Sequence, residues 1–309
     1  MGANLKNEKK LLEILDRQIL VSDGAMGTTL QEFGYTAYPD TLNLNKNSGD
    51  LQKITDIHLS YLEAGSDIIQ TNTFGSNPIK LDLFSLPNEV EKINKNAVNA
   101  AKQAIEIYRE KNRNNKELFI AGNIGPSGKL MEPYGDLKYS TAVDSFAKQV
   151  DILLECNVDL LIIETMMDLT EALAAIEAAR KISSDILVAC TLTFRENGVT
   201  IMGNKAETAG KDLLETGSDI IGANCSVGSK AMIHIVEKIR NANPHAKLLV
   251  QPNAGLPVIV EGKTKFNETP EIMANNFKEI LKYKPSIVGA CCGSKPAHIE
   301  KIAELVKNS

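Results

Sequence analysis

The chain has 309 residues and a formal net charge of −5, with 34 basic and 39 acidic side chains, 43% hydrophobic residues and five cysteines. The modest charge, without a long basic run, argues against nucleic acid as a partner. No apolar run is long enough to span a membrane, and the first 17 residues carry no signal-peptide core, so we expect no membrane association. The cysteines lack disulfide-scaffold spacing, which favours a reducing cytoplasm.

Apolar runs at strand and helix spacing alternate along the chain. A short helix at about 5–17 comes first and is expected to close the bottom of the core. Strands are expected at residues 19–27 (ending in a glycine-rich turn), 67–73, 118–125, 159–165, 186–194, 219–225, 247–255 and 286–292. Helices are expected at residues 54–62, 88–111, 141–155, 169–182, 206–215, 231–241, 270–282 and 297–307.

Eight strands that alternate with eight helices predict a parallel sheet with right-handed crossovers. Such barrels typically have about 250 residues, so the count and the length favour a closed (β/α)₈ TIM barrel. Residues 1–309 would then form a single domain. An open, doubly wound sheet is the alternative.

A short internal repeat supports this assignment. The stretch Glu63-Ala-Gly-Ser-Asp-Ile-Ile69 recurs at residues 215–221 and, more loosely, at residues 155–161. Each copy ends a helix with Gly or Asn, which accept the left-handed conformation, and then enters an apolar run. We interpret the copies as tight turns at the bottom of the barrel.

The opposite ends of the strands carry polar or thiol residues. In a (β/α)₈ barrel the catalytic groups lie at the carboxyl ends of the strands, so these residues converge on one cup. They are Asp23, Thr71, Asn72, Thr73, Asn123, Glu164, Cys225, Asn253, Cys291 and Cys292.

Three thiols at two strand ends suggest one tetrahedral zinc site with an open fourth position. The alternative is inert, buried cysteine that behaves as a small hydrophobic residue. Consecutive strand residues point in opposite directions, so Cys291 and Cys292 can share an ion only if the strand has ended and Gly293 lets the backbone turn. We interpret Cys156, at a helix end, and Cys190, in mid-strand, as packing residues.

Two carboxylates, Asp23 and Glu164, end strands at the expected mouth. They either cap or pair with other groups, or they bind a cationic group such as the ammonium of an amino acid. The glycine-rich loop at residues 122–128 matches no phosphate-binding spacing and is interpreted as a shaped loop. The four histidines fall in or near helices and are expected to have surface or packing roles.

Seven short stretches, in order along nearly the whole chain, resemble one family. They are Asp23-Gly-Ala-Met-Gly-Thr28, Gln70-Thr-Asn-Thr-Phe-Gly75, Gly122-Asn-Ile-Gly-Pro126, Ile163-Glu-Thr165, Gly222-Ala-Asn-Cys225, Gln251-Pro-Asn-Ala-Gly255 and Gly289-Ala-Cys-Cys-Gly293. Together they resemble the zinc-dependent homocysteine S-methyltransferases, and most of all the N-terminal homocysteine-binding barrel of cobalamin-dependent methionine synthase.

The resemblance implies a set of site residues. Zinc would be held by the thiolates of Cys225, Cys291 and Cys292, and Asn253 resembles the residue that approaches zinc when substrate is absent. The amino-acid pocket would include Asp23, Gly24, Thr71, Asn72, Thr73 and Glu164. One departure is Ser294-Lys295 after the Cys-Cys-Gly, where small polar residues, often threonine, are usual.

The resemblance also implies a reaction. The homocysteine sulfur, held as a zinc-bound thiolate, would attack an activated methyl group and form methionine, with no catalytic side chain beyond the metal ligands. Members of the family use methylcobalamin, betaine, S-methylmethionine or S-adenosylmethionine; methylcobalamin, on a separate corrinoid protein or on further domains, is the donor we expect here.

Other functions stay open at this stage. The barrel could be a homocysteine-binding module, or it could methylate a related thiol or selenol with a separate corrinoid carrier. It could also be a divalent-metal lyase that uses Asp23 and Glu164 as oxygen ligands, although three thiols favour zinc.

Overall fold

The computed structural model describes residues 10–35, 42, 44–46, 48–113, 116–260 and 263–308. Eight strands form one sheet, in the order β1-β10-β7-β6-β5-β4-β3-β2, and all their pairings are parallel. A parallel bridge between Ser22 and Ile68 joins the two edges of the sheet. The strands are β1 (Leu20–Val21), β2 (Ile68–Gln70), β3 (Phe119–Ile124), β4 (Leu160–Met166), β5 (Leu187–Leu192), β6 (Ile220–Gly228), β7 (Lys247–Asn253) and β10 (Ile287–Val288).

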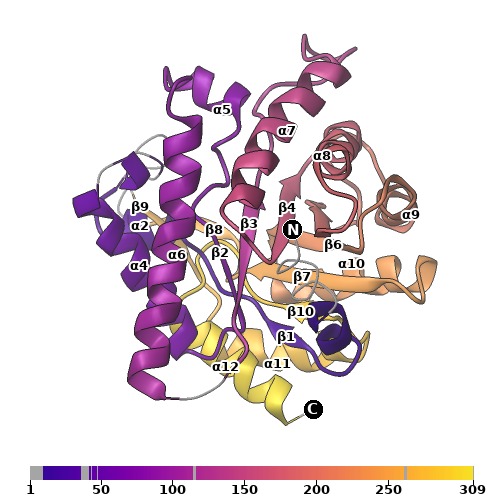
Figure 1. Ribbon diagram of the computed structural model, residues 1–309. Coiled ribbons are helices and arrows are strands. Elements are labelled where there is room, and N and C mark those ends of the chain that lie inside the picture. The colour runs from indigo at the N-terminus through magenta and orange to yellow at the C-terminus, as the bar shows by residue number, and fades with distance from the viewer. Residues whose placement is uncertain are drawn as a thin grey trace.

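Helices surround this sheet (Figure 1). They include α4 (Ser48–Glu63), α6 (Val90–Asn112), α7 (Tyr139–Glu155), α8 (Leu169–Ile182), α9 (Ala206–Thr216), α10 (Ser229–Ala242), α11 (Pro270–Leu281) and α12 (Pro296–Lys307). The arrangement confirms the predicted (β/α)₈ TIM barrel and excludes the open sheet, because the two edge strands of a doubly wound sheet would not meet.

Several short elements were absent from the prediction. They are α2 (Gly27–Glu32), η1 (Leu44–Lys46), α5 (Pro78–Leu83) and an antiparallel hairpin of β8 (Pro257–Val260) and β9 (Lys263–Phe266). All of them lie in connections that follow a barrel strand. The first and last strands were also predicted too long, since β1 ends at Val21 and β10 at Val288, and a turn follows β10 at residues 292–293.

Alternation along the strands divides the apolar side chains into two sets. One set faces the helices and belongs to the large outer core. The other set fills the interior of the barrel and contains Leu20, Ile68, Phe119, Ala121, Leu160, Ile162, Leu187, Ala189, Ile220, Leu249 and Ile287. The interior of the barrel is therefore filled with apolar side chains, and polar groups can lie only at its two ends.

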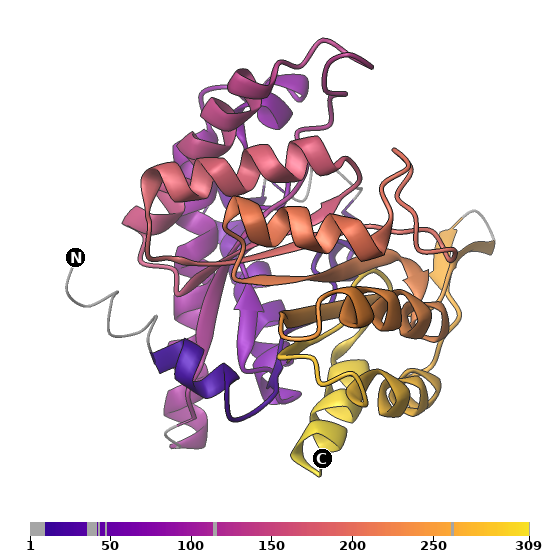
Figure 2. The same cartoon turned by 90° about the vertical axis from the view of Figure 1, so that its right-hand side faces the viewer.

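The N-terminal helix closes one end of the barrel. Residues 10–15 are helical, and Leu11 and Leu15 belong to the same buried cluster as the interior strand residues. Figure 2 shows this helix at the end of the barrel away from the β8–β9 hairpin. Of the helix predicted at about residues 5–17, residues 10–15 are helical and residues 16–17 form a turn, while residues 5–9 lie outside the described residues.

The repeated turns lie at this same end of the barrel. Gly65, Asn157 and Gly217 have positive φ values of 110°, 56° and 110°, as the repeat predicted. The aspartate two residues after each turn accepts a hydrogen bond of 2.8 Å from a backbone amide of the preceding strand. The amides are those of Val21, Ile120 and Val188, bound by Asp67, Asp159 and Asp219 respectively. The repeat therefore ties neighbouring strands together.

Candidate metal centre and adjoining pocket

A ring of polar side chains forms the last interior layer at the carboxyl ends of the strands. Each member lies two or four residues after an apolar interior residue, and within the strands this alternation directs the side chain into the barrel; Cys291 lies beyond β10 and lines the same cavity. The members are Ser22, Gln70, Asn123, Glu164, Thr191, Asn224, Gln251 and Cys291. All are buried except Cys291, which is half-buried. Polar groups placed in a buried layer require partners or a ligand.

Three thiols meet at one side of this ring. The sulfur of Cys292 lies 3.9 Å from that of Cys225 and 4.0 Å from that of Cys291. A tetrahedral zinc with bonds of about 2.3 Å holds its ligand sulfurs about 3.8 Å apart. Within the described chain, this trio is the only group of three or more His, Cys, Asp or Glu side chains spaced to hold a metal ion. The thiols therefore fit zinc and leave a fourth position for another ligand.

Turns bring the three sulfurs together. Cys225 and Ser226 have left-handed φ values of 59° and 64°, and the pairing of β6 with β7 shifts register between Asn224 and Gly228. Gly293 has a φ of 79°, so the backbone reverses directly after Cys292. This is the turn that the sequence required if neighbouring cysteines were to face one ion.

The three thiols shift one another's pKa values. Hydrogen bonds from Cys291 and Cys292 lower the pKa of the Cys225 thiol to about 3. The same hydrogen bonds with Cys225 raise the pKa of Cys292 to about 12 and that of Cys291 well above its usual value. One thiolate is thus held by two thiols, and a bound cation is needed to ionise all three.

A cavity of about 340 Å³ adjoins the thiols. Its lining brings together most of the residues that the sequence predicted, namely Asp23, Gly24, Thr71, Asn72, Asn123, Glu164, Cys225, Cys291 and Cys292. Thr73 is not in the lining; its hydroxyl donates a 2.6 Å hydrogen bond to the Asn123 carbonyl and supports Thr71. Asn253 is also outside the lining, but its side chain hydrogen-bonds the Cys225 thiol.

The two carboxylates of the cavity are buried and have no cationic partner among the residues that the structure describes. Asp23 accepts hydrogen bonds from the backbone and side-chain amides of Gln70, at 2.8 and 3.2 Å. Glu164 accepts one from Asn123 at 2.8 Å and one from Asn224 at 2.9 Å. Burial raises the pKa of both carboxyl groups to about 7. Since no Lys, Arg or His is among the described lining residues, a cationic ligand group would find two acceptors here.

The remaining predictions concern residues outside the cavity. The backbone amide and the hydroxyl of Ser127 both donate to the buried carboxylate of Glu171, at 2.7 and 2.5 Å. Two donors of the glycine-rich loop are thus already used by the protein, as expected for a shaped loop. None of the four histidines lines the cavity, and Cys156 and Cys190 pack against or within the outer core, as predicted.

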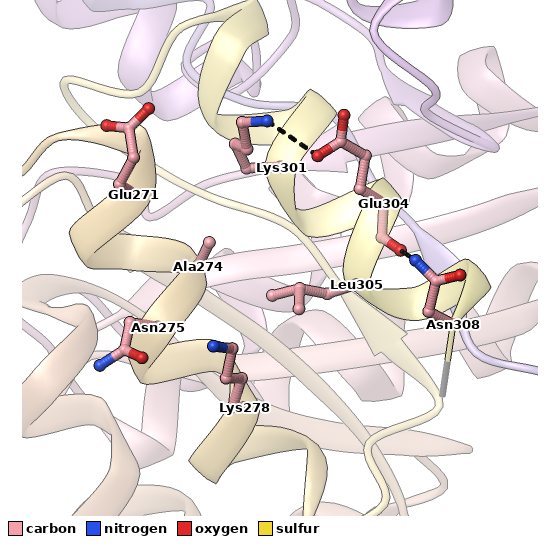
Figure 3. Close-up of a pocket in the computed structure, with 8 residues that line it drawn as sticks. All are labelled: Glu271, Ala274, Asn275, Lys278, Lys301, Glu304, Leu305 and Asn308. Carbon is pink, nitrogen blue, oxygen red and sulfur yellow. Dashed lines mark hydrogen bonds and ion pairs between the residues drawn. The ribbon is translucent and has the colours of Figure 1, made fainter.

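A second hollow, of about 440 Å³, lies between α11 and α12 (Figure 3). Ala274 and Leu305 form its apolar part, and an ion pair of 2.8 Å between Lys301 and Glu304 lies at its side. It is on the outer surface of the barrel, and its described lining residues include no Cys or His. The cavity beside the thiols is therefore the candidate functional site.

Sequence reasoning missed five members of the polar ring: Ser22, Gln70, Thr191, Asn224 and Gln251. The signal that identifies them is the two-residue period, because each follows an interior apolar residue at an even spacing, which places it on the interior face; these apolar residues are Leu20, Ile68, Ala189, Ile220 and Leu249. No helix in the described part of the chain is both long enough and apolar enough to cross a membrane.

Comparison with known proteins gives relatives along most of the chain. The chain is 30% identical over 311 residues to methionine synthase of Mycobacterium tuberculosis (strain ATCC 25618 / H37Rv). It is 29% identical over 309 residues to methionine synthase of Mycobacterium leprae (strain TN). Each alignment covers 96% of this chain but 25% of the relative, so the chain spans about a quarter of the length of these curated relatives.

A solved structure with the same fold is the metallated form of the homocysteine methyltransferase MmuM from Escherichia coli. It aligns with a TM-score of 0.79 at 21% identity, covering 95% of this chain and 98% of that one. The family description "Homocysteine S-methyltransferase" matches residues 20–306, which include every strand of the barrel and all three clustered thiols. On this match, the chain belongs to the homocysteine S-methyltransferase family.

Proposed function

We propose that this chain is a zinc-dependent homocysteine S-methyltransferase domain, spanning residues 1–309, that converts homocysteine to methionine. The observation that carries the proposal is the triangle of thiols in the wall of a cavity that also holds two carboxylates and, among its described lining residues, no Lys, Arg or His. The thiols suit a metal-bound sulfur, and the carboxylates suit an ammonium group. Family membership supports this choice of substrate.

The metal-binding residues in this proposal are Cys225, Cys291 and Cys292. Their sulfur separations fit zinc, and thiolate ligands favour zinc over hard cations such as Mg²⁺. Zinc bound there would keep a substrate thiol ionised and nucleophilic at neutral pH. The metallated form of MmuM, a protein of the same fold, agrees with a metal-binding role.

The amino-acid end of the substrate would lie against Asp23 and Glu164. Its ammonium group would replace the missing counter-charge of the carboxylates, which explains why the protein buries them. Gly24, Thr71 and Asn72 line the same space, and Thr73 and Asn253 support it from behind. Holding both ends of the substrate orients its sulfur toward the mouth, which supplies the entropic part of the rate enhancement.

The methyl donor in the proposal is methylcobalamin, carried by further domains or by a separate corrinoid protein. The ground is that the methionine synthases that the chain resembles are about four times its length. The free thiols of the site are consistent with the reducing cytoplasm that the cysteine spacing favours. MmuM matches the chain over almost its whole length, so a small donor is the alternative to test.

Turnover with a panel of donors tests the proposal. Zinc-loaded protein is mixed with L-homocysteine and methylcobalamin, betaine, S-methylmethionine or S-adenosylmethionine, and methionine is measured by mass spectrometry. We expect product with methylcobalamin. Homocysteine binding without product from any donor would indicate a binding module instead.

Calorimetry provides the matched binding control. Norvaline has the shape of homocysteine with a methyl group in place of the thiol, so it should bind far more weakly if a metal–sulfur bond forms. Equal affinities for the two amino acids would contradict the proposed role of the metal.

A further inference from the structure

The side chain of Asn224 lies between the two halves of the candidate site. It is fully buried, and its amide nitrogen is 2.9 Å from Oε2 of Glu164 and 3.9 Å from the sulfur of Cys291. It therefore touches both the carboxylate proposed for the ammonium group and a proposed metal ligand. In the described chain it is the only side chain for which hydrogen bonds to both groups are recorded.

The orientation of this amide is fixed by its oxygen. Oδ1 of Asn224 is 2.8 Å from the backbone nitrogen of Thr165 and 2.8 Å from the hydroxyl of Thr191. A backbone amide can only donate, so the atom facing it must be the oxygen. The nitrogen, with its two hydrogens, must then face Glu164, the Thr165 hydroxyl at 2.7 Å and Cys291.

This amide completes the hold on Glu164. Asn123, from the strand on one side, donates to Oε1, and Asn224 donates to Oε2. With one donor on each oxygen, the plane of the carboxylate is set, and its remaining lone pairs are free for a ligand. Loss of one donor would leave the carboxylate free to rotate in a buried space.

We propose that Asn224 is a positioning residue that orients Glu164 toward the ammonium group of the acceptor amino acid and fixes its place relative to the metal ligand Cys291. The inference rests on the proposed function. It assigns to Asn224 a part in recognising the amine of the substrate rather than its sulfur, and the two contributions can be separated by the choice of ligand.

The test compares two thiols that differ only in the α-amino group: L-homocysteine and 4-mercaptobutanoate. Their dissociation constants from the zinc-loaded protein are measured by calorimetry. The dissociation constant of 4-mercaptobutanoate divided by that of L-homocysteine is the ratio that reports recognition of the amine. Asn224→Asp keeps an oxygen for Thr165 and Thr191 but removes the donor to Glu164 and Cys291. We expect the ratio to fall at least about tenfold, as when a hydrogen bond to a charged group is lost.

Thr191 of β5 and Thr193, which follows that strand, supply a second variant and a matched control. Thr191→Val removes one anchor of the Asn224 side chain, so the ratio should fall in the same direction but by less, about threefold. Thr193 donates instead to the backbone oxygen of Asn224, at 3.1 Å. Thr193→Val should therefore leave the ratio unchanged.

Zinc content and thermal melting are recorded for each variant. An unchanged ratio in a folded, zinc-loaded Asn224→Asp protein would overturn the inference while the proposed function stands. An equal loss of both thiols in that variant would also overturn it, since Asn224 would then only support the fold. If the wild-type protein itself bound the two thiols equally, the proposed function would fall, and this inference with it.

Discussion

The two ends of the barrel use carboxylates in opposite ways. At the closed end, Asp67 accepts a hydrogen bond from the amide of Val21 at 2.8 Å and pairs with Lys116 at 2.9 Å. At the mouth, the hydrogen-bond donors to Asp23 and Glu164 among the described residues are neutral amides and the hydroxyl of Ser22, and burial raises the pKa of both carboxyl groups to about 7. One end contains its own counter-charge and the other does not.

This difference separates stability from function. A carboxylate paired within the protein stabilises the fold in its charged form, whereas a buried carboxylate without a cation costs stability unless a ligand supplies the charge. The comparison teaches that burial alone does not identify a functional residue. A buried carboxylate is identified as functional when its counter-charge has to come from a ligand. Four predictions test this view.

The largest effect is expected at the metal ligands. Cys291→Ser should weaken zinc binding by more than about 100-fold, a loss that already results when supporting groups around a metal are removed. Zinc content after dialysis against a competing chelator measures this. Cys156→Ser, which changes a thiol on the outside of the barrel, is the matched control and should retain zinc. Retention of zinc by Cys291→Ser would exclude that thiol as a ligand.

Neutralising the mouth carboxylate should come next. Glu164→Gln should weaken homocysteine binding by on the order of 2–5 kcal/mol, because the ammonium group loses its buried counter-charge. Zinc content should be unchanged, and 4-mercaptobutanoate should bind nearly as before. An equal loss of both ligands would mean that Glu164 supports the barrel mouth and that the amine binds elsewhere.

The same variant should alter the pH dependence of stability without homocysteine. The folded pKa of Glu164, about 7, lies above its ordinary value of 4.5, so its contribution to stability is present at low pH and is lost as the pH rises through 7. At pH 8, Glu164→Gln should therefore be more stable than wild type by about 3 kcal/mol, with the difference vanishing near pH 4.5. Urea unfolding across this range measures it. A constant difference at all pH values would contradict the argument.

The smallest effect is expected at the closed end, and with the opposite sign. Asp67→Asn keeps an acceptor for the amide of Val21 but loses the ion pair with Lys116, so it should destabilise the protein by about 1 kcal/mol at pH 8. Homocysteine affinity, measured by calorimetry, should not change. If Asp67→Asn stabilised the protein as Glu164→Gln does, the contrast between the two ends would fail.

Most of the fold could be predicted from the sequence because its signals are local. The apolar runs marked each strand, and the Gly and Asn turns at residues 65, 157 and 217 marked the closed end. The thiols could be placed at the mouth because they follow apolar runs directly. Their convergence could be expected only from the barrel itself, since α10, β7, β8, β9 and α11 lie between β6, which contains Cys225, and β10, which precedes Cys291.

The unpredicted parts depend on contacts distant in the sequence. Hairpin β8–β9 contains a proline and charged residues, and Phe266 near its end packs against Gly293 of the thiol turn. Asn224 directly precedes Cys225 in the sequence. Its contacts with Glu164 and Thr191 depend on the direction of its side chain, which the sequence does not give. A contact of this kind has no signal within one stretch of the chain.

The polar ring at the mouth also limits where residues can be inserted into or deleted from this chain. Side chains along a strand point alternately to the inside and the outside of the barrel. Inserting or deleting one residue within a strand would therefore turn its ring member outward and bring an outer apolar side chain into the site. A connection after a strand, such as the one that contains β8 and β9, can change in length without moving the ring. Length differences among homologues should therefore collect in the loops, and a library of single-residue insertions should lose homocysteine binding abruptly at the boundaries of the strands.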